Sequence, residues 1–357
     1  MTIKSTGEDA YFVASNSARG FYSYYPQCFD DARIERVFAI KGGPGTGKSR
    51  FMRDVANAGE ACGWRCEYIY CSSDPDSLDG IILSKEECAM ALIDATAPHV
   101  YEPSHPGVRE ELINLGEFWD RNKLVEHRAE IEEYSKQKSE GYRAAYRYLA
   151  AYGEMIANRD ALVAPYLCLD AMEHYAEKLF FDIPRGYRFA ERHALIRSVG
   201  MRGEIGFDTY FARAKRIYLI EDCHGSAQYL MRFLYHLAER RRISLRISHD
   251  PILPDRIDGM LLCDSGIAFV TGRIEECQYP HKRIGTRRFI EISKMKTAKP
   301  ALYHAERMAR AMLGGAIDAM ERVRDAHFEI ENLYINAMDF DKKEEFTRRF
   351  CEGVFQS

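Results

Sequence analysis

The sequence has no apolar run long enough to cross a membrane, and its beginning, Met1-Thr2-Ile3-Lys4, has no apolar signal core. These absences predict a cytoplasmic protein without a membrane partner. The chain also carries little excess charge. Its net charge of −4 lacks the broad basic field of nucleic-acid-binding proteins, which disfavours nucleic acid as a partner. Basic clusters such as Arg240-Arg241-Arg242 are therefore expected to be solvated surface.

Metal-ligand pairs are missing as well, although the chain has ten cysteines. Cys62, Cys66 and Cys71 lie near one another in the sequence, but a zinc site needs ligand pairs at tight spacing plus a second pair. We therefore expect these cysteines to be small, buried apolar residues in a reducing compartment.

What the sequence does contain is a phosphate-binding loop. Residues 36–41 form a short apolar run typical of a buried strand, and Gly42-Gly43-Pro44-Gly45-Thr46-Gly47-Lys48-Ser49 follows directly. This octapeptide matches G-x-x-x-x-G-K-[ST] at every position, and a helix is predicted over residues 50–62. The glycines let backbone N–H groups converge on phosphate oxygens, Lys48 reaches the β- and γ-phosphates, and the Ser49 hydroxyl takes one position around Mg²⁺. We therefore expect a nucleoside triphosphate, ATP, with Mg²⁺.

Two aspartates are candidates for the chemistry around this loop. Residues 89–93 are predicted to form a buried strand that ends at Asp94, where P-loop proteins hold the magnesium shell. Asp94 is therefore assigned to the metal together with Ser49, and a loop-capping aspartate is the alternative. Asp74 follows the strand predicted for residues 66–71 and is our candidate for the group that orients the attacking water or hydroxyl. A solvated loop carboxylate is the alternative for Asp74.

The chain repeats itself with a period near 180 residues. The best-matching block is Pro75-Asp76-Ser77-Leu78-Asp79-Gly80 against Pro254-Asp255-Arg256-Ile257-Asp258-Gly259. A duplicated α/β unit is therefore predicted. Pro75, Asp76, Asp79 and Gly80, which both copies keep, are expected to build a turn, whereas Asp74 has no acidic counterpart in the second copy.

The second copy lacks the phosphate-binding chemistry. Its loop, Asp222-Cys223-His224-Gly225-Ser226-Ala227-Gln228-Tyr229, is one residue shorter and has no Gly-Lys-Ser end. Glu221 and Asp222 would repel a phosphate. We therefore predict one nucleotide per chain, with the second half acting as a scaffold or a regulator. If it regulates, Arg256 is our candidate for an arginine finger presented to the first loop.

Each copy is followed by a long helical stretch. Core-type positions recur at steps of three and four in the first stretch, at Tyr142, Ala145, Leu149, Tyr152 and Ile156. A second stripe of this kind runs from Ala305 to Ala337. These stripes predict helices packed on each other or across the two halves, with His327 as a core histidine.

Four segments carry a resemblance to a known family: Ala18–Tyr22, Gly42–Ser49, Cys71–Gly80 and Asp94–His99. Over nearly the whole chain, the sequence resembles a family of uncharacterised bacterial proteins with two P-loop repeats, described only as ATP-binding or ATPase-like. In that family the second repeat commonly carries its own phosphate loop, from which residues 222–229 depart. The resemblance implies an α/β P-loop fold and ATP, but no substrate. His99 itself is expected to be a hydrogen-bonded loop histidine.

We therefore expect a duplicated P-loop NTPase-like α/β protein with parallel sheets. The expected boundaries are 14–115 for the first unit, 116–190 for its helical arm, 195–293 for the degenerate unit and 294–357 for the C-terminal arm. The expected function is magnesium-dependent ATP hydrolysis at one N-terminal site, with Lys48, Asp74 and Asp94 as the catalytic residues. A small-molecule or nucleotide kinase and a nucleotide-gated binding module with little turnover are the alternatives. The sequence identifies neither an acceptor nor a protein partner.

Overall fold

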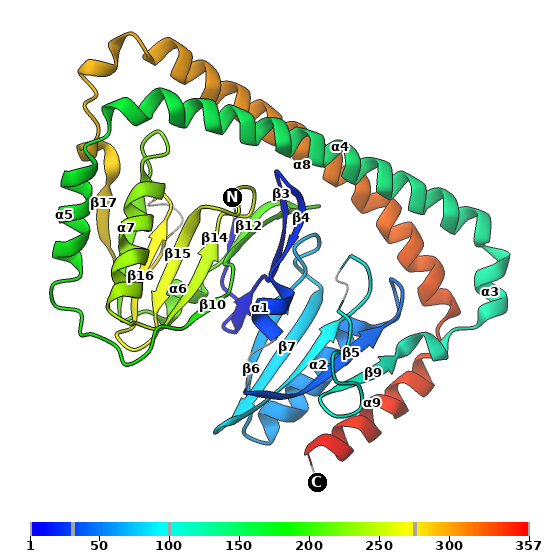
Figure 1. Ribbon diagram of the computed structural model, residues 1–357. Helices are drawn as coiled ribbons and strands as arrows, with labels where there is room; N and C mark the ends of the chain where they lie inside the picture. The colour runs from blue at the N-terminus through cyan, green and yellow to red at the C-terminus, as the bar shows by residue number, and fades with distance from the viewer. Residues whose placement is uncertain (1, 30–32, 99–100, 274–276, 356–357) are drawn as a thin grey trace.

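The structure is a computed structural model, and it describes residues 2–29, 33–98, 101–273 and 277–355. It is a mixed α/β protein with two six-stranded sheets that contain parallel strand pairs, which confirms the expected fold class at this level. A pair of long helices runs along both sheets (Figure 1). None of the helices in the described ranges combines the length and the apolar character needed to cross a membrane.

The first six-stranded sheet has the order β2-β6-β7-β8-β5-β9. β5 lies between two parallel neighbours, and β7 is antiparallel to both of its neighbours. The strands are β2 (Asp9–Tyr11), β5 (Ile34–Lys41), β6 (Arg65–Tyr70), β7 (Leu78–Lys85), β8 (Cys88–Asp94) and β9 (Glu110–Asn114). Because β2 belongs to this sheet, the first unit begins earlier than the expected boundary at residue 14.

Two helices from distant parts of the sequence pack together on this sheet. α2 (Lys48–Ala61) begins at the end of the phosphate loop and buries Phe51 in the core. α9 (Phe340–Phe355) packs beside α2. The Phe350 ring of α9 lies 4.9 Å from that of Phe38 and 5.2 Å from that of Phe51, measured between ring centroids. The first unit therefore has a core that residues near the end of the chain complete.

The second six-stranded sheet has the order β10-β14-β15-β16-β13-β17, and its pairs have the same parallel and antiparallel senses as those of the first sheet. The strands are β10 (Glu191–His193), β13 (Arg216–Glu221), β14 (Leu245–His249), β15 (Ile257–Leu262), β16 (Ile267–Thr271) and β17 (Lys282–Gly285). This sheet therefore includes residues before the expected boundary at 195. α7 (Ala227–Arg240) packs on it, and α5 (Leu169–Leu179) packs against α7.

The long helices α4 (Arg128–Val163) and α8 (Lys299–Ala337) pack against each other, as the apolar stripes predict. They run in opposite directions along both units (Figure 1). α4 leaves the first unit and is followed by α5, which packs on the second unit. α8 leaves the second unit and is followed by α9, which packs on the first. The two units therefore exchange their terminal helices.

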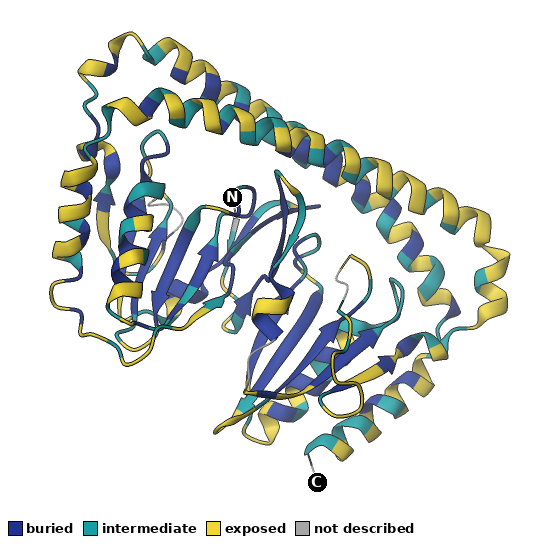
Figure 2. Ribbon diagram, in the orientation of Figure 1, coloured by how far each residue is buried: buried dark blue, intermediate teal, exposed yellow. Residues whose placement is uncertain are grey.

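Shorter elements join the two halves. They are β1 (Thr2–Lys4), β3 (Ala14–Ser17), β4 (Gly20–Ser23), β11 (Arg197–Gly200), β12 (Gly203–Phe207), α1 (Tyr25–Phe29), α3 (Arg121–Glu126) and α6 (Thr209–Arg213). β1 pairs in parallel with β12, about 200 residues later in the chain, and β3 and β4 form a hairpin. Figure 2 shows that the strands of both six-stranded sheets are largely buried, whereas the outer faces of the long helices are exposed.

The buried carboxyl group of Asp258, in the second unit, makes the free energy of unfolding depend on pH. Burial raises the pKa of Asp258 to about 7, and the Arg197 guanidinium, 3.6 Å from its carboxylate, opposes this rise. In the unfolded chain the same group titrates near 3.8, so its stabilising contribution is full below that pH and is lost as the pH rises through 7. We expect the free energy of unfolding to fall by about 2 kcal/mol between pH 5.5 and 8 because of this group.

Denaturant titrations at the two pH values check this, with Asp258→Asn as the comparison. The variant has no proton to lose and should show a flatter pH dependence. The same slope in both proteins would assign the pH dependence to other groups.

Candidate nucleotide-binding site

The Gly42–Ser49 loop connects the end of β5 to the start of α2. Gly45 and Gly47 have φ angles of 69° and 74°, in the left-handed region that glycine adopts without strain. Among the described residues, the backbone N–H groups of residues 45–49 donate no hydrogen bond. Those groups surround the first turn of a 14-residue helix, whose dipole also favours an anion. The loop is therefore built as an anion-binding nest.

Lys48 and Asp94, both predicted site residues, lie together at this loop. Lys48 Nζ donates to the carbonyl oxygens of Gly42 and Gly43, at 2.8 Å each, and is 3.5 Å from Asp94 Oδ2. Thr96, which sequence reasoning did not assign, fixes this arrangement. Its N–H donates to Asp94 Oδ1 at 2.8 Å and its hydroxyl to the Gly42 carbonyl at 2.9 Å. A bound phosphate would compete with the two loop carbonyls for the Lys48 ammonium.

A second acid, Asp79, lies at the same edge of the sheet. The sequence comparison assigns Pro75, Asp76, Asp79 and Gly80 to a turn. Pro75 and Asp76 do lie in the turn over residues 74–77, but the assignment is wrong for Asp79 and Gly80, which belong to β7. Gly80 pairs with Ile93, so Asp79 stands beside the end of β8. Burial raises the pKa of Asp94; the Lys48 charge lowers it and the Asp79 charge raises it further.

Ser49 joins these acids at the metal side of the loop. Its hydroxyl oxygen accepts the Leu78 N–H at 3.0 Å, which holds the serine next to Asp79. The described residues contain no group of three or more His, Cys, Asp or Glu side chains placed to hold a metal alone. A serine hydroxyl with nearby carboxylates suits Mg²⁺, which takes most of its ligands from phosphate and water. The residues present therefore fit a metal that arrives with a triphosphate.

The hydrogen-bond and ion-pair partners of Asp74 lie outside the Gly42–Ser49 loop. Its carboxylate is 3.6 Å from Arg202 Nε and accepts the Asp76 N–H at 3.4 Å. Burial raises its pKa, while the Asp76 N–H and the Arg202 charge lower it. Asp74 therefore makes no direct contact with Lys48, although its charge reaches Glu331 on α8. His99 lies outside the described residues.

The far end of α8 packs directly on the phosphate loop, which the sequence did not predict. A Cβ at Gly45 would stand 2.5 Å from the Glu331 carbonyl oxygen, and one at Gly43 would stand 3.1 Å from the Tyr334 ring. These contacts give both glycines a packing role besides their phosphate-binding one. His327, four residues before Glu331, lies on the same helix face; its Nδ1 is 3.2 Å from Lys138 Nζ of α4. His327 is therefore part of a polar cluster rather than a purely apolar core.

In the second loop, a side chain of the loop itself accepts hydrogen bonds from the backbone N–H groups. Asp222 Oδ2 accepts the Gly225 N–H and Asp222 Oδ1 accepts the Ala227 N–H, both at 2.8 Å. A carboxylate of the chain therefore takes the hydrogen bonds that a phosphate would receive in the first loop. The sequence predicted charge repulsion by Asp222; its carboxylate also occupies the N–H groups.

Side chains of α4 cover this second loop. Asp160 ion-pairs with Arg159, accepts the Gln228 amide at 2.9 Å and ion-pairs with Arg256. A Cβ at Gly225 would stand 2.2 Å from the Arg159 guanidinium. Arg256 is thus held at the second loop by Asp160, and the arginine-finger hypothesis for the first loop is wrong in this arrangement.

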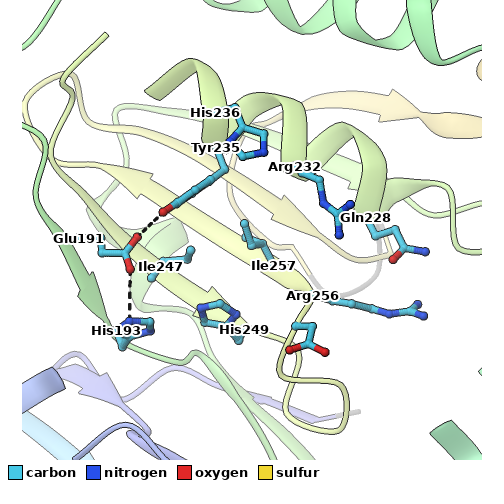
Figure 3. Close-up of a pocket in the computed structure, with 11 residues that line it drawn as sticks. Glu191, His193, Gln228, Arg232, Tyr235, His236, Ile247, His249, Arg256 and Ile257 are labelled. Carbon is cyan, nitrogen blue, oxygen red and sulfur yellow. Dashed lines mark hydrogen bonds and ion pairs between the residues drawn. The ribbon is translucent and has the colours of Figure 1, made fainter. Parts of the chain in front are cut away.

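The second unit also has a cavity of about 280 Å³ beside α7 (Figure 3). It is lined by one face of α7, by β10, β14 and β15, and by the segment that leads into β15. Glu191 joins two of its lining residues: Tyr235 donates to its carboxylate at 2.7 Å, and His193 Nε2 lies 3.5 Å away. Gln228 and Arg256, both bound to Asp160, also line it. The cavity therefore lies next to the contacts of Asp160 with Gln228 and Arg256 that cover the second loop.

The cysteines match their expected role only in part. All ten are free; Cys28, Cys66 and Cys277 are buried, but Cys62 is exposed. Comparisons of the chain with family models, with curated proteins and with solved structures found no match.

Proposed function

We propose that the protein binds ATP with Mg²⁺ at the Gly42–Ser49 loop and hydrolyses it. One observation carries this proposal: the N–H groups of this loop have no acceptor among the described residues, whereas Asp222 caps the equivalent groups of the second loop. The lysine and serine that an NTP site needs are present only at the first loop.

The proposed reaction follows from the residues around Lys48. Water attacks the γ-phosphorus, the bond from that phosphorus to the β–γ bridging oxygen breaks, and the products are ADP, phosphate and a proton. The Lys48 ammonium stabilises charge on the γ-phosphate oxygens, and the loop N–H groups bind the phosphates before reaction. Mg²⁺, held by Ser49 with Asp94 beside it, would neutralise charge on the phosphates. Asp74 is our candidate for orienting the water.

Turnover of ATP by the purified chain tests the reaction class. We expect phosphate release that requires Mg²⁺ and continues without any added acceptor. Phosphate transfer seen only with an added small molecule would indicate a kinase. Tight binding of ATP with no product of either kind would indicate a nucleotide-gated binding module and overturn the proposed hydrolysis.

Asp94→Asn is expected to weaken nucleotide binding in Mg²⁺ more than in EDTA, because the acid acts through the metal. We expect a loss of about tenfold or more with Mg²⁺ and less than threefold without it, since charged hydrogen bonds of this kind contribute about 1.5–3 kcal/mol. Calorimetric titrations of both proteins in both buffers measure this. Asp76→Asn, at an exposed carboxylate paired with Lys4, is the matched control. Equal losses in the two buffers would make Asp94 a structural residue.

One nucleotide per chain is expected, because the second loop has no free N–H nest. Calorimetry with a non-hydrolysable ATP analogue counts the sites. We also expect Asp222→Asn to leave the count at one, because Lys48 and Ser49 have no counterparts there. A count of two in the parent protein would contradict the degenerate second loop.

A further inference from the structure

A polar cluster on the long helices lies over the phosphate loop and has no part in the reaction proposed above. It consists of Lys138 of α4 with His327 and Glu331 of α8. Lys138 Nζ is 3.2 Å from His327 Nδ1, and Glu331 contacts Gly45 through its carbonyl oxygen. The cluster therefore faces the loop from the side of the helix pair.

The hydrogen-bond partner of Lys138 is a neutral ring. Burial lowers the pKa of His327 to about 4, and the charges of Lys138 and Lys48 lower it further. His327 is therefore uncharged near pH 7, and its Nδ1 accepts a hydrogen bond from the Lys138 ammonium. Among the described residues, no carboxylate lies within ion-pair distance of Lys138. Glu331 influences Lys138 electrostatically without an ion pair.

The charges of Lys48 and Lys138 both act on His327 and Glu331. Burial lowers the pKa of Lys138; the charges of Cys71 and Glu331 oppose this, and that of Lys48 adds to it. The Lys48 charge acts on His327 and Glu331 as well. Two ammonium groups that repel each other across a loop with unsatisfied N–H groups form a site for a highly charged anion. Three carboxylates, those of Glu331, Asp74 and Asp94, also act on this region; among the described residues only Asp94 lies within ion-pair distance of one of the two lysines, at 3.5 Å from Lys48.

We propose that Lys138 is a second cationic ligand of the γ-phosphate, supplied by the helix pair, and that it lets the protein distinguish a nucleoside triphosphate from a diphosphate. This inference rests on the proposed nucleotide site. The loop N–H groups contact phosphates that both nucleotides share, and Lys48 reaches the β-phosphate of both as well as the γ-phosphate, whereas the proposed contact of Lys138 is with the γ-phosphate alone. Loss of the γ-phosphate therefore removes the anion that holds α4 to the first loop.

Through α4, the presence or absence of the γ-phosphate at Lys138 would also affect the second unit. Arg159 and Asp160, which cover the second loop, lie 21 and 22 residues after Lys138 on α4, about 32 Å along a continuous helix. On α8, Glu306 binds His224 of the second loop at 2.7 Å, and Glu331 contacts the first. α8 therefore touches both loops, and α4 touches the second loop and would reach the first through the proposed Lys138 contact, so that a shift of α4 at Lys138 would reach Asp160.

The test measures the affinities of the full chain for Mg²⁺–AMP-PNP and for Mg²⁺–ADP by calorimetry. We expect Lys138→Met to weaken AMP-PNP binding at least tenfold and to change ADP binding by less than twofold. Lys138→Arg keeps the charge and should retain most of the preference for the triphosphate. Lys136→Met, which removes an exposed lysine from the same helix, is the matched control and should bind both nucleotides like the parent.

Equal losses for AMP-PNP and ADP, or no loss for either, would overturn the role of Lys138. A circular dichroism melt of each variant shows whether an equal loss of affinity for the two nucleotides comes from unfolding. A Lys138→Arg variant that has normal stability but does not prefer AMP-PNP to ADP also refutes the inference. The proposed function fails in a different way, when the parent protein binds neither nucleotide or when Lys48→Ala binds both as tightly as the parent.

Discussion

Lys48→Ala is expected to reduce the affinity for Mg²⁺–ATP by roughly ten- to a hundredfold and to reduce turnover at least as much. A charged hydrogen bond of this type contributes about 1.5–3 kcal/mol to binding. Turnover falls further if Lys48 contacts the γ-phosphate more strongly in the transition state than in the ground state. In the folded protein Lys48 Nζ donates to two loop carbonyls and lies near Asp94. Its removal therefore leaves one buried charged partner, the Asp94 carboxylate, without its cation.

The measurement pairs calorimetric titration with a phosphate-release assay, and Arg50→Ala is the control. Arg50 lies in the first turn of the same helix, is exposed, and pairs with Asp54 at 3.0 Å. Its loss changes the net charge equally without touching the loop. If Lys48→Ala and the parent bind ATP with the same affinity, the Gly42–Ser49 loop is not the nucleotide site.

Separate expression of residues 1–190 and 191–357 is expected to give two chains that do not fold alone. The first half lacks α9, and Phe38 and Phe51 then lose the Phe350 ring. The second half lacks α5, whose Met172 and Ala176 belong to the core around α7. Burial of each large apolar side chain stabilises by on the order of 1–3 kcal/mol, so a lost helix removes an amount similar to the whole stability of a domain.

Co-expression of the two halves should restore a soluble one-to-one complex, because each half then supplies the helix that the other needs. Size-exclusion chromatography and far-ultraviolet circular dichroism of single and paired halves measure this. Two halves that are each monomeric and cooperatively folded would show that the exchanged helices contribute little to either core. Phe350→Ala in the intact chain is a milder version, with an expected loss of about 2–4 kcal/mol.

The local parts of the site could be predicted because neighbouring residues determine them. A strand, a glycine loop and a helix in direct succession place Gly45, Gly47 and Lys48 without knowledge of the rest of the chain. Asp94 follows from the rule that parallel strands end at one edge, and β8 does pair in parallel with β5. The 180-residue period predicted a duplicated α/β unit, and the structure has two six-stranded sheets with the same strand order, which the period alone does not specify.

The features that the sequence did not predict depend on which helices and loops pack against each other. An apolar stripe shows that a helix is buried on one face, but it does not show that α9 packs on α2 or that α8 reaches Gly45. Lys138 and His327 look like a surface lysine and a core histidine until the two helices are paired. Asp222 was understood as a repelling charge because the sequence does not show its hydrogen bonds to Gly225 and Ala227. A polar residue at a core-type position, such as His327, is the signal that could have pointed to the cluster.

Because the two units exchange helices, the first unit cannot complete its core until the end of translation. The ribosome makes α2 when residue 61 is added, but α9, which packs beside it, is complete only at residue 355. At about 5–20 residues per second, the difference of 294 residues takes roughly 15–60 s. During that interval Phe38 and Phe51 lack the ring that shields them, and β1 waits for β12 in the same way. The half that carries the Gly42–Ser49 loop is therefore made first and completed last, and its nascent form presents an apolar surface to chaperones for most of translation.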